Sequence, residues 1–312
     1  MRKIAFAVLF TFLVMLTGCG KTAPLKIGVI QYGEHPALDL AYEGFLDGLK
    51  TEGFVNGENF AIDYGNAQSD GTKCESIATR LVAEQNNLIL AIATPAAQAV
   101  ARKTKSIPIL VTAVTDPQSA GLVRSNDYPQ TNVSGTSDLT PCAKQIDLVT
   151  KLVPTTKTIG LLYSSGEENS CYQADLAKRA CSERGLSFID ATVSDKNEVQ
   201  EAVQSLVGKV DAIYTPTDNL IASCMETISM IASENKLPVI VGEEGMVQGG
   251  GLATYGINYY ELGRKTAEMA IEIIRNGRQI QNMPVQYLDS YEFSYNKYTA
   301  AELGITIPSD IQ

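Results

Sequence analysis

The chain has 312 residues, of which 45% are hydrophobic and 19% charged, and its 35 acidic and 25 basic side chains give a net charge of −10. This length suits one large domain or two of ordinary size. The acidic balance and the lack of a dense cluster of Lys and Arg argue against nucleic acid as a partner. His35 is the only histidine and no Cys-x-x-Cys pair occurs, so the usual spacings of zinc ligands are missing. We therefore expect neither a metal nor a cofactor.

The N-terminus has the pattern of an export signal. Two basic residues precede an apolar run over residues 4–16, and the sequence Leu-Thr-Gly leads directly to Cys19. The run is shorter than the roughly 18 to 20 residues that span a bilayer, which argues against an uncleaved membrane helix. We expect residues 1–18 to form a signal peptide, Cys19 to be lipidated, and residues 19–24 to form a linker. The protein would then be anchored to the cell membrane on its extracytoplasmic face.

Strand-like apolar runs alternate with helical patterns after the linker, which predicts a parallel α/β architecture. Three strand-like segments of the first half recur in the same order in the second half. The pairs are 26–30 with 158–162, 90–95 with 211–216, and 106–111 with 236–241. Their spacing is far longer than the roughly 20 to 50 residues of solenoid repeats. We expect two doubly wound, Rossmann-like lobes with a cleft between them.

The C-terminal part does not fit a simple tandem of two lobes. A long helical pattern over 260–276 follows Asn258, and a strand-like run occupies 285–288. We expect the chain to cross back to the first lobe near residue 257 and to leave it near residue 286, which makes a hinge of several segments. The expected lobes are 25–136 plus 258–285, and 137–257 plus 286–312.

In open α/β sheets ligands bind beyond the carboxyl ends of the strands, where helices begin. The turns at these ends carry hydroxyls, free N–H groups and carboxylates, but no Lys or Arg. This set suits a zwitterion, whose carboxylate would accept from hydroxyl or backbone donors of Thr94, Ala96, Ser164 and Ser165, while Asp218 or Glu243 would bind its ammonium. The full candidate set is Tyr32, Glu34, Thr94, Ala96, Asp116, Ser137, Ser164, Ser165, Asn169, Ser170, Asp218, Asn219 and Glu243.

Two further residue types bear on the site. The strand ends also carry tyrosines that could hold an aromatic ligand or a cation, namely Tyr32, Tyr163, Tyr214 and Tyr255. Five cysteines follow Cys19, so they cannot all pair internally, and we interpret them mainly as small apolar core residues.

The same turns resemble a known family, the lipoprotein substrate-binding components of ABC importers related to the tryptophan and tyrosine binders. The matching segments span the chain after the linker and include Glu34–Asp39, Ala91–Ala99, Thr112–Pro117, Gly135–Asp138, Pro216–Asn219 and Gly242–Val247. The resemblance implies a type I periplasmic-binding-protein fold that closes on a small ligand. It also implies an amino acid ligand, most simply Trp, Tyr or Phe, and delivery by a monomer to a separate ABC permease and its ATPase.

Rival functions remain open at this level. A receptor that signals, or a binder of nucleosides or peptides, would have the same sequence features. An enzyme is the less favoured rival, because neither a Gly-x-Ser-x-Gly elbow nor a phosphate loop is present. Two carboxylates across the cleft could still cleave a glycoside, which leaves a carboxylate-based hydrolase as an alternative.

Overall fold

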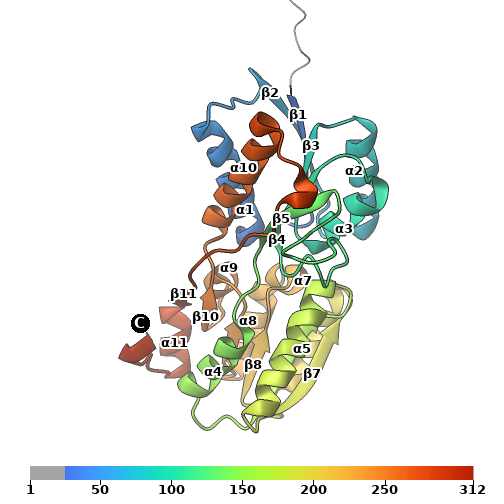
Figure 1. Cartoon of the computed structure of the whole chain (residues 1–312). Coiled ribbons are helices and arrows are strands. Elements are labelled where there is room, and N and C mark those ends of the chain that lie inside the picture. The colour runs from blue at the N-terminus through green and yellow to red at the C-terminus, as the bar shows by residue number, and fades with distance from the viewer. Residues whose placement is uncertain (1–24, 312) are drawn as a thin grey trace, which may run out of the picture.

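The structure is a computed structural model that describes residues 25–311. The expected signal peptide, the lipidation site Cys19 and the linker up to residue 24 lie outside the described residues. Within the described range, no helix combines the length and apolar character that crossing a membrane requires. The described chain forms an upper and a lower lobe, each built on its own sheet (Figure 1).

Lobe 1 contains a five-stranded parallel sheet in the order β2-β1-β3-β4-β5. Helices cover both faces of the sheet, and its strands are therefore almost continuously apolar. The strands are β1 (Leu25–Gln31), β2 (Phe60–Asn66), β3 (Leu88–Ile92), β4 (Ile109–Val114) and β5 (Val133–Ser137). The helices are α1 (Pro36–Thr51), α2 (Gly71–Ala83), α3 (Thr94–Lys103) and α10 (Tyr259–Asn276), with the 3-10 turn η2 (Ile280–Asn282).

Lobe 2 contains a six-stranded sheet in the order β11-β10-β9-β8-β6-β7, in which only the edge strand β11 is antiparallel. Its strands are β6 (Thr158–Ser164), β7 (Ser187–Val193), β8 (Ala212–Thr215), β9 (Val239–Val241), β10 (Ala253–Gly256) and β11 (Glu292–Tyr295). Its helices are α4 (Cys142–Leu152), α5 (Glu168–Glu183), α6 (Val199–Leu206), α7 (Asn219–Ala222), α8 (Met225–Glu234), α9 (Glu244–Gln248) and α11 (Lys297–Leu303). Two 3-10 turns complete the lobe, η1 (Lys196–Glu198) and η3 (Ser309–Ile311).

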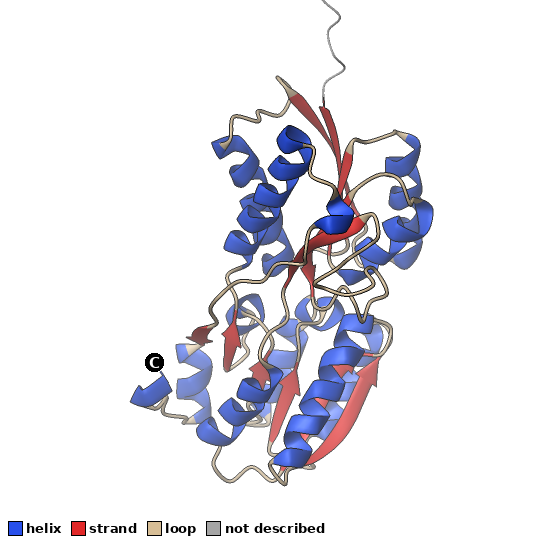
Figure 2. Ribbon diagram, viewed as in Figure 1, coloured by secondary structure: helices blue, strands red, loops and turns tan. Residues whose placement is uncertain are grey.

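The strands that the sequence pairs across the two halves occupy equivalent places in the two sheets. β1, β3 and β4 stand side by side in lobe 1, and β6, β8 and β9 do so in lobe 2. In each lobe the second strand, β2 or β7, lies on the outer side of the first. Figure 2 shows the resulting layers, with helices on both sides of each sheet. The expected α/β architecture of two doubly wound lobes is confirmed.

One predicted strand is wrong. Residues 285–288 form no strand, and they pair with the first sheet only through a single bridge between Thr136 and Gln286. Pro284 precedes this segment and has no N–H to donate. The true last strand, β11, begins at Glu292 and pairs with β10 of lobe 2. The 285–288 segment is instead part of the connection that runs from lobe 1 to lobe 2.

The helix α10 returns from lobe 2 to pack against α1, although the two are far apart in sequence (Figure 1). Two glycines allow the close approach of the helices. A Cβ atom at Gly44 would lie 2.0 Å from the Tyr260 carbonyl oxygen, and one at Gly263 would lie 2.0 Å from that of Ala41. The chain therefore passes between the lobes after β5, before α10 and before β11, and these passages meet at the cleft.

Candidate functional site

A small cavity lies where the carboxyl ends of the strands of both lobes face each other. Lobe 1 and its connections line it with His35, Leu38, Ala113, Thr115, Asp138 and Tyr259, and lobe 2 with Asn169, Thr217, Asp218, Asn219, Ala222 and Glu243. Its volume is about 20 Å³, which is room for about one water molecule. The lobes are therefore closed tightly on each other at this point.

Hydrogen bonds join the two lobes around the cavity. His35 Nε2 lies 3.2 Å from Asn219 Oδ1. The Gln173 amide on α5 donates to the Thr115 hydroxyl at 3.3 Å. The Tyr259 hydroxyl at the start of α10 donates to Asp138 at 2.8 Å. The last bond ties two of the passages between the lobes to each other.

Two of the acidic side chains at the cleft cap short helices of lobe 2. Asp218 accepts the Ile221 N–H at the start of α7 at 2.8 Å and the Ser164 N–H at 2.6 Å. Glu243 accepts the Met246 N–H at the start of α9 at 2.9 Å, and also the Gly245 N–H. These bonds explain why the two carboxyl groups are fixed at the strand ends.

Two more acidic side chains complete the group. Glu167 precedes α5 and accepts the Leu220 N–H at 3.0 Å and the Asn219 side-chain amide. Asp138 follows β5 and accepts from Tyr259. All four carboxyl groups are buried, with Asp138 and Glu167 each 4% exposed. We call Asp138, Glu167, Asp218 and Glu243 the acidic cluster.

Burial is the main cause that raises the pKa of every member of the acidic cluster. It raises the pKa of Glu243 to about 7, with smaller contributions from the nearby carboxylates of Asp138 and Glu244. It also raises the pKa of Glu167, where the charge of Asp218 adds to the effect, and the pKa values of Asp218 and Asp138. Neither Lys nor Arg is among the residues that line the cavity. A ligand with a positive charge would stabilise the ionised form of these carboxyl groups.

The structure places the predicted site residues in three groups. The side chains of Asn169, Asp218, Asn219 and Glu243 line the cavity. The second group, Tyr32, Ser164 and Ser170, lies close by without lining the cavity. Burial and the charges of Glu167 and Asp218 raise the pKa of Tyr32 to about 12. Ser164 donates its N–H to Asp218, and the Ser170 hydroxyl lowers the pKa of Asp218.

The other predicted residues have local roles. Glu34 and Ser165 are exposed, and the side chain of Ala96 packs in the apolar core of lobe 1, so that only its backbone could meet a ligand. Asp116 accepts from Ser119 and Asn126, and Ser137 donates to the Thr115 carbonyl group. Thr94 is the first residue of α3, and the N-cap of that helix is Ala93, whose φ of 79° is unusual for a residue other than glycine.

Sequence reasoning missed half of the acidic cluster and two neutral residues beside it. Asp138 directly follows the predicted Ser137, and Glu167 lies between the predicted Ser165 and Asn169. His35 directly follows the predicted Glu34, and Tyr259 directly follows Asn258, where the long helix begins. For Asp138, Glu167 and His35, the usable signal was a position one or two residues beyond a predicted site residue, whereas Tyr259 had no such signal.

Three of the four tyrosines at strand ends are packed away from the cavity. The Tyr163 hydroxyl accepts from Lys178, the Tyr214 hydroxyl donates to Gln145, and Tyr255 packs against Phe293. Only Tyr32 remains near the acidic cluster. The five cysteines of the described chain are all free, and Cys74, Cys142 and Cys181 are buried, which agrees with their interpretation as core residues.

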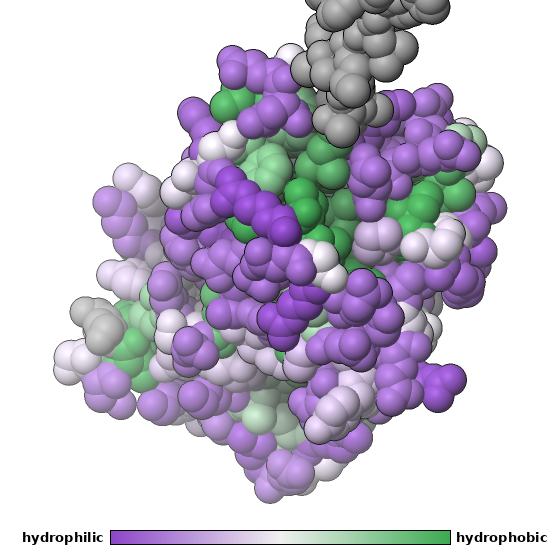
Figure 3. Space-filling view, turned by 45° about the horizontal axis from the view of Figure 1, so that its top comes forward, coloured by the Kyte–Doolittle hydropathy of each residue, from purple (hydrophilic) through white to green (hydrophobic). Residues whose placement is uncertain are grey.

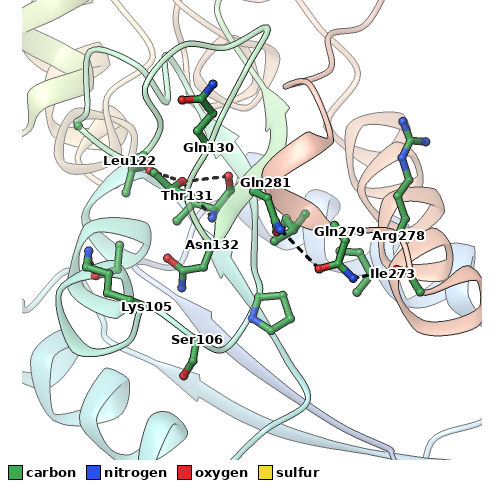
Figure 4. Close-up of a pocket in the computed structure, with 16 residues that line it drawn as sticks. Lys105, Ser106, Leu122, Gln130, Thr131, Asn132, Ile273, Arg278, Gln279 and Gln281 are labelled. Carbon is green, nitrogen blue, oxygen red and sulfur yellow. Dashed lines mark hydrogen bonds between the residues drawn. The ribbon is translucent and has the colours of Figure 1, made fainter.

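A much larger cavity lies at the other end of lobe 1, which we call the far groove. Its volume is about 700 Å³, and it opens between the amino ends of β4 and β5, the end of α10 and η2. Figure 3 shows apolar surface at this end of the molecule between strongly hydrophilic regions. Lys105 and Arg278 lie on opposite sides of the groove, and no acidic residue lines it (Figure 4).

Comparison with known proteins identifies the family. Residues 26–312 match the model of the ABC transporter substrate binding protein family. The chain belongs to this family. Its members are extracytoplasmic binding proteins and not enzymes, which agrees with the sequence-based expectation and removes the hydrolase alternative. Among the described residues, no group of three or more His, Cys, Asp or Glu side chains has an arrangement suited to a metal ion.

Several relatives are similar over nearly the whole chain. A tyrosine-binding protein of Clostridioides difficile (strain R20291) is 43% identical over 93% of this chain and 88% of its own. The structure of an ABC domain from Streptococcus pneumonia in complex with L-Trp is 39% identical, with a TM-score of 0.89 over 93% of this chain and 97% of that one. The leucine-binding protein LivK of Thermotoga maritima, 17% identical with a TM-score of 0.63 over 89% and 87% of the two chains, shares the type I fold.

A third solved structure indicates which state this chain adopts. The ligand-free, open structure of a substrate-binding protein with adhesive properties from Clostridium difficile is 46% identical, over 92% of this chain and 97% of that one. Its TM-score of 0.71 is nevertheless lower than the 0.89 of the L-Trp complex, which is less similar in sequence. Together with the hydrogen bonds between the lobes, this difference indicates a closed conformation.

Proposed function

We propose that this protein is a lipid-anchored receptor of an ABC importer that captures an aromatic amino acid, Trp, Tyr or Phe, by closing its two lobes. The ligand would then be delivered to a permease coupled to an ATPase. The observation that carries the proposal is the acidic cluster, whose four carboxyl groups are buried at a closed cleft that is lined by neither Lys nor Arg.

The charge of the cluster supports a ligand with an ammonium group. Buried carboxylates that have no cationic partner are costly, and a bound cation lowers that cost through charge-assisted hydrogen bonds. Among common nutrients, amino acids carry such a group next to a carboxylate. The N–H groups of Thr94 and Ala96 at the start of α3, together with the Thr94 hydroxyl, are our candidate donors for that carboxylate.

The aromatic nature of the ligand rests on the relatives. One relative, at 43% identity, is a tyrosine-binding protein, and another, at 39% identity, was solved in complex with L-Trp. Tyr32 lies at the edge of the cluster and offers an aromatic ring to such a ligand. A cavity of about 20 Å³ does not hold an aromatic amino acid, so binding requires the lobes to separate first. The lobes would then close around the ligand, less tightly than in this structure, because a conformation that contacts the ligand from both lobes binds it with higher affinity.

The lipid anchor and the transport role rest on sequence and family. The proposed modification of Cys19 would leave only a short linker before β1, and the protein would remain near its permease at a high effective concentration. A diacylglyceryl group supplies the two chains that stable attachment needs.

A thermal-shift screen tests the proposed ligand class. Residues 22–312 would be unfolded, dialysed and refolded to remove any co-purified ligand, then heated with each amino acid, with nucleosides and with sugars. At one hundred times its Kd, a ligand stabilises the protein by about 2.7 kcal/mol, and we expect this shift with Trp, Tyr or Phe. A shift with a nucleoside and none with any amino acid would show that the proposed ligand class is wrong.

A further inference from the structure

Three buried acceptor atoms at the cavity have no hydrogen-bond partner among the described residues. They are His35 Nδ1, Asp138 Oδ1 and Asn169 Oδ1, and all three residues line the same cavity. Their side chains are 4% to 8% exposed. A buried polar atom without a partner is costly, so three of them around one small cavity call for a functional explanation.

The orientation of Asn169 follows from its neighbour. Its amide nitrogen donates to the Thr217 carbonyl oxygen at 3.3 Å, and a carbonyl oxygen can only accept. The side-chain oxygen of Asn169 must therefore point the other way, and it is the atom without a partner. Asn169 thus presents an acceptor to the cavity.

The proton on His35 is fixed through a chain of two further bonds. The Glu167 carboxylate accepts the Asn219 amide nitrogen, so the Asn219 oxygen is the atom that faces His35 Nε2. Nε2 must then carry the hydrogen. Burial lowers the pKa of His35, so its ring is neutral and Nδ1 is a bare acceptor.

Asp138 supplies the third acceptor and the negative charge. One of its oxygens accepts from the Tyr259 hydroxyl, and the other has no partner. In contrast, both oxygens of Asp218 and both oxygens of Glu243 already accept backbone N–H groups. The sequence-based expectation that Asp218 or Glu243 binds the ammonium directly therefore shifts to Asp138.

We infer that His35 Nδ1, Asp138 Oδ1 and Asn169 Oδ1 together bind the ammonium group of the ligand, one N–H to each acceptor. This inference rests on the proposed function. A primary ammonium has three donors and one positive charge, which matches three acceptors of which one is a carboxylate. A water molecule has only two hydrogens to donate and no charge. Because His35 comes from lobe 1, Asn169 from lobe 2 and Asp138 from a passage between them, the ammonium would join both lobes and the hinge.

Calorimetry with two ligands and two variants tests this site. The ligands are L-tryptophan and indole-3-propionate, which lacks the ammonium, with the weaker ligand measured by competition. We expect Asp138→Asn and Asn169→Ala each to weaken L-tryptophan binding about 10- to 100-fold, the usual range for a lost hydrogen bond to a charged group, and to change indole-3-propionate binding less than threefold. Gln173 also donates to the Thr217 carbonyl oxygen, so Asn169→Ala leaves that oxygen paired.

Asp289→Asn is the matched control. Asp289 is an exposed aspartate on another passage between the lobes, so this variant removes the same charge without touching the cavity. We expect it to bind L-tryptophan as the wild type does. Equal losses for both ligands would reveal a hinge effect and overturn the inference, as would unchanged L-tryptophan affinity in both variants. Failure of the wild type to bind any of Trp, Tyr and Phe would instead refute the proposed function itself.

Discussion

The cleft cavity and the far groove lie at opposite ends of the same two strands, β4 and β5, and they differ in every property that matters for binding. The far groove is the larger, at about 700 Å³ against about 20 Å³. It is lined by Lys105 and Arg278 and by no acid, whereas the cleft is lined by acids and by neither Lys nor Arg. The cleft alone gathers buried side chains from both lobes. The volume of a cavity therefore does not identify the ligand-binding site in this protein. Buried carboxyl groups without a cationic partner are the better criterion.

The largest expected effect comes from removing a charge of the acidic cluster. We expect Asp218→Ala to weaken amino acid binding by about 30-fold, because the ammonium that Asp138 binds directly also loses a second buried charge at the same cavity, worth about 2 kcal/mol. Calorimetry measures the affinity, and a melting curve separates it from the loss of the α7 cap. Unchanged affinity would remove Asp218 from the site.

The pH dependence of stability probes the same charges without a ligand. Carboxyl groups whose pKa is raised in the folded state stabilise it below about pH 4.5, and this contribution is lost as the pH rises through the folded-state pKa. For Glu243, a rise from 4.5 to about 7 corresponds to about 3 kcal/mol. We expect the melting temperature of the ligand-free protein to fall from pH 5 to pH 8, and the fall to be smaller when an amino acid is bound.

His35 contributes to this profile in the opposite direction. Burial lowers its pKa, so its contribution is present above about pH 6.5 and is lost as the pH falls. The four carboxyl groups outweigh this single histidine. Glu243→Gln should flatten the profile, and a melting temperature that rises towards pH 8 would contradict the assignment of raised pKa values to the cluster.

A smaller effect is expected from the bond that joins the lobes at Thr115. Thr115→Val removes the acceptor of the Gln173 amide across the cleft while keeping the shape of the side chain. The closed state should lose about 1 kcal/mol, and ligand affinity should fall about fivefold. Small-angle scattering should show a larger fraction of open molecules. Thr115→Ser keeps the hydroxyl and is the control, and an equal effect of both substitutions would exclude the bond as the cause.

The smallest effect is expected in the far groove. Arg278→Ala changes the charge at a cavity that has no contact with the cleft, and we expect less than a twofold change in amino acid affinity. A tenfold change would show that the comparison between the two cavities is misleading and that the far groove takes part in binding.

The fold was accessible from sequence because the two halves repeat the same order of strands. Each pair of matched segments marked an equivalent place in the two sheets, and the strand-end rule then pointed to the correct turns. The run 285–288 misled because apolar residues predict a strand whether or not a neighbouring strand is available to pair with it. Pro284 was the local signal against a strand, because a proline has no N–H to donate to a neighbouring strand.

The details of the site were less accessible, because they depend on contacts between distant residues. His35 and Asn219 are 184 positions apart, and nothing local to either one shows that they meet. The choice between Asp138 and Asp218 as the direct partner of an ammonium depends on which oxygens the backbone already occupies. A linear pattern can show that acids gather at strand ends, but not which of their atoms remain free.

The packing of α10 against α1 has a consequence for the order in which the chain folds. Phe45 and Leu49 on α1 are buried in a core that also contains Leu262 and Ala270 of α10. A nascent chain that has reached only residue 250 therefore cannot complete lobe 1, even though all five strands of its sheet have been made. Such long-range contacts delay folding. For an extracytoplasmic protein this delay is useful, since a polypeptide must stay unfolded until it has passed through the export channel.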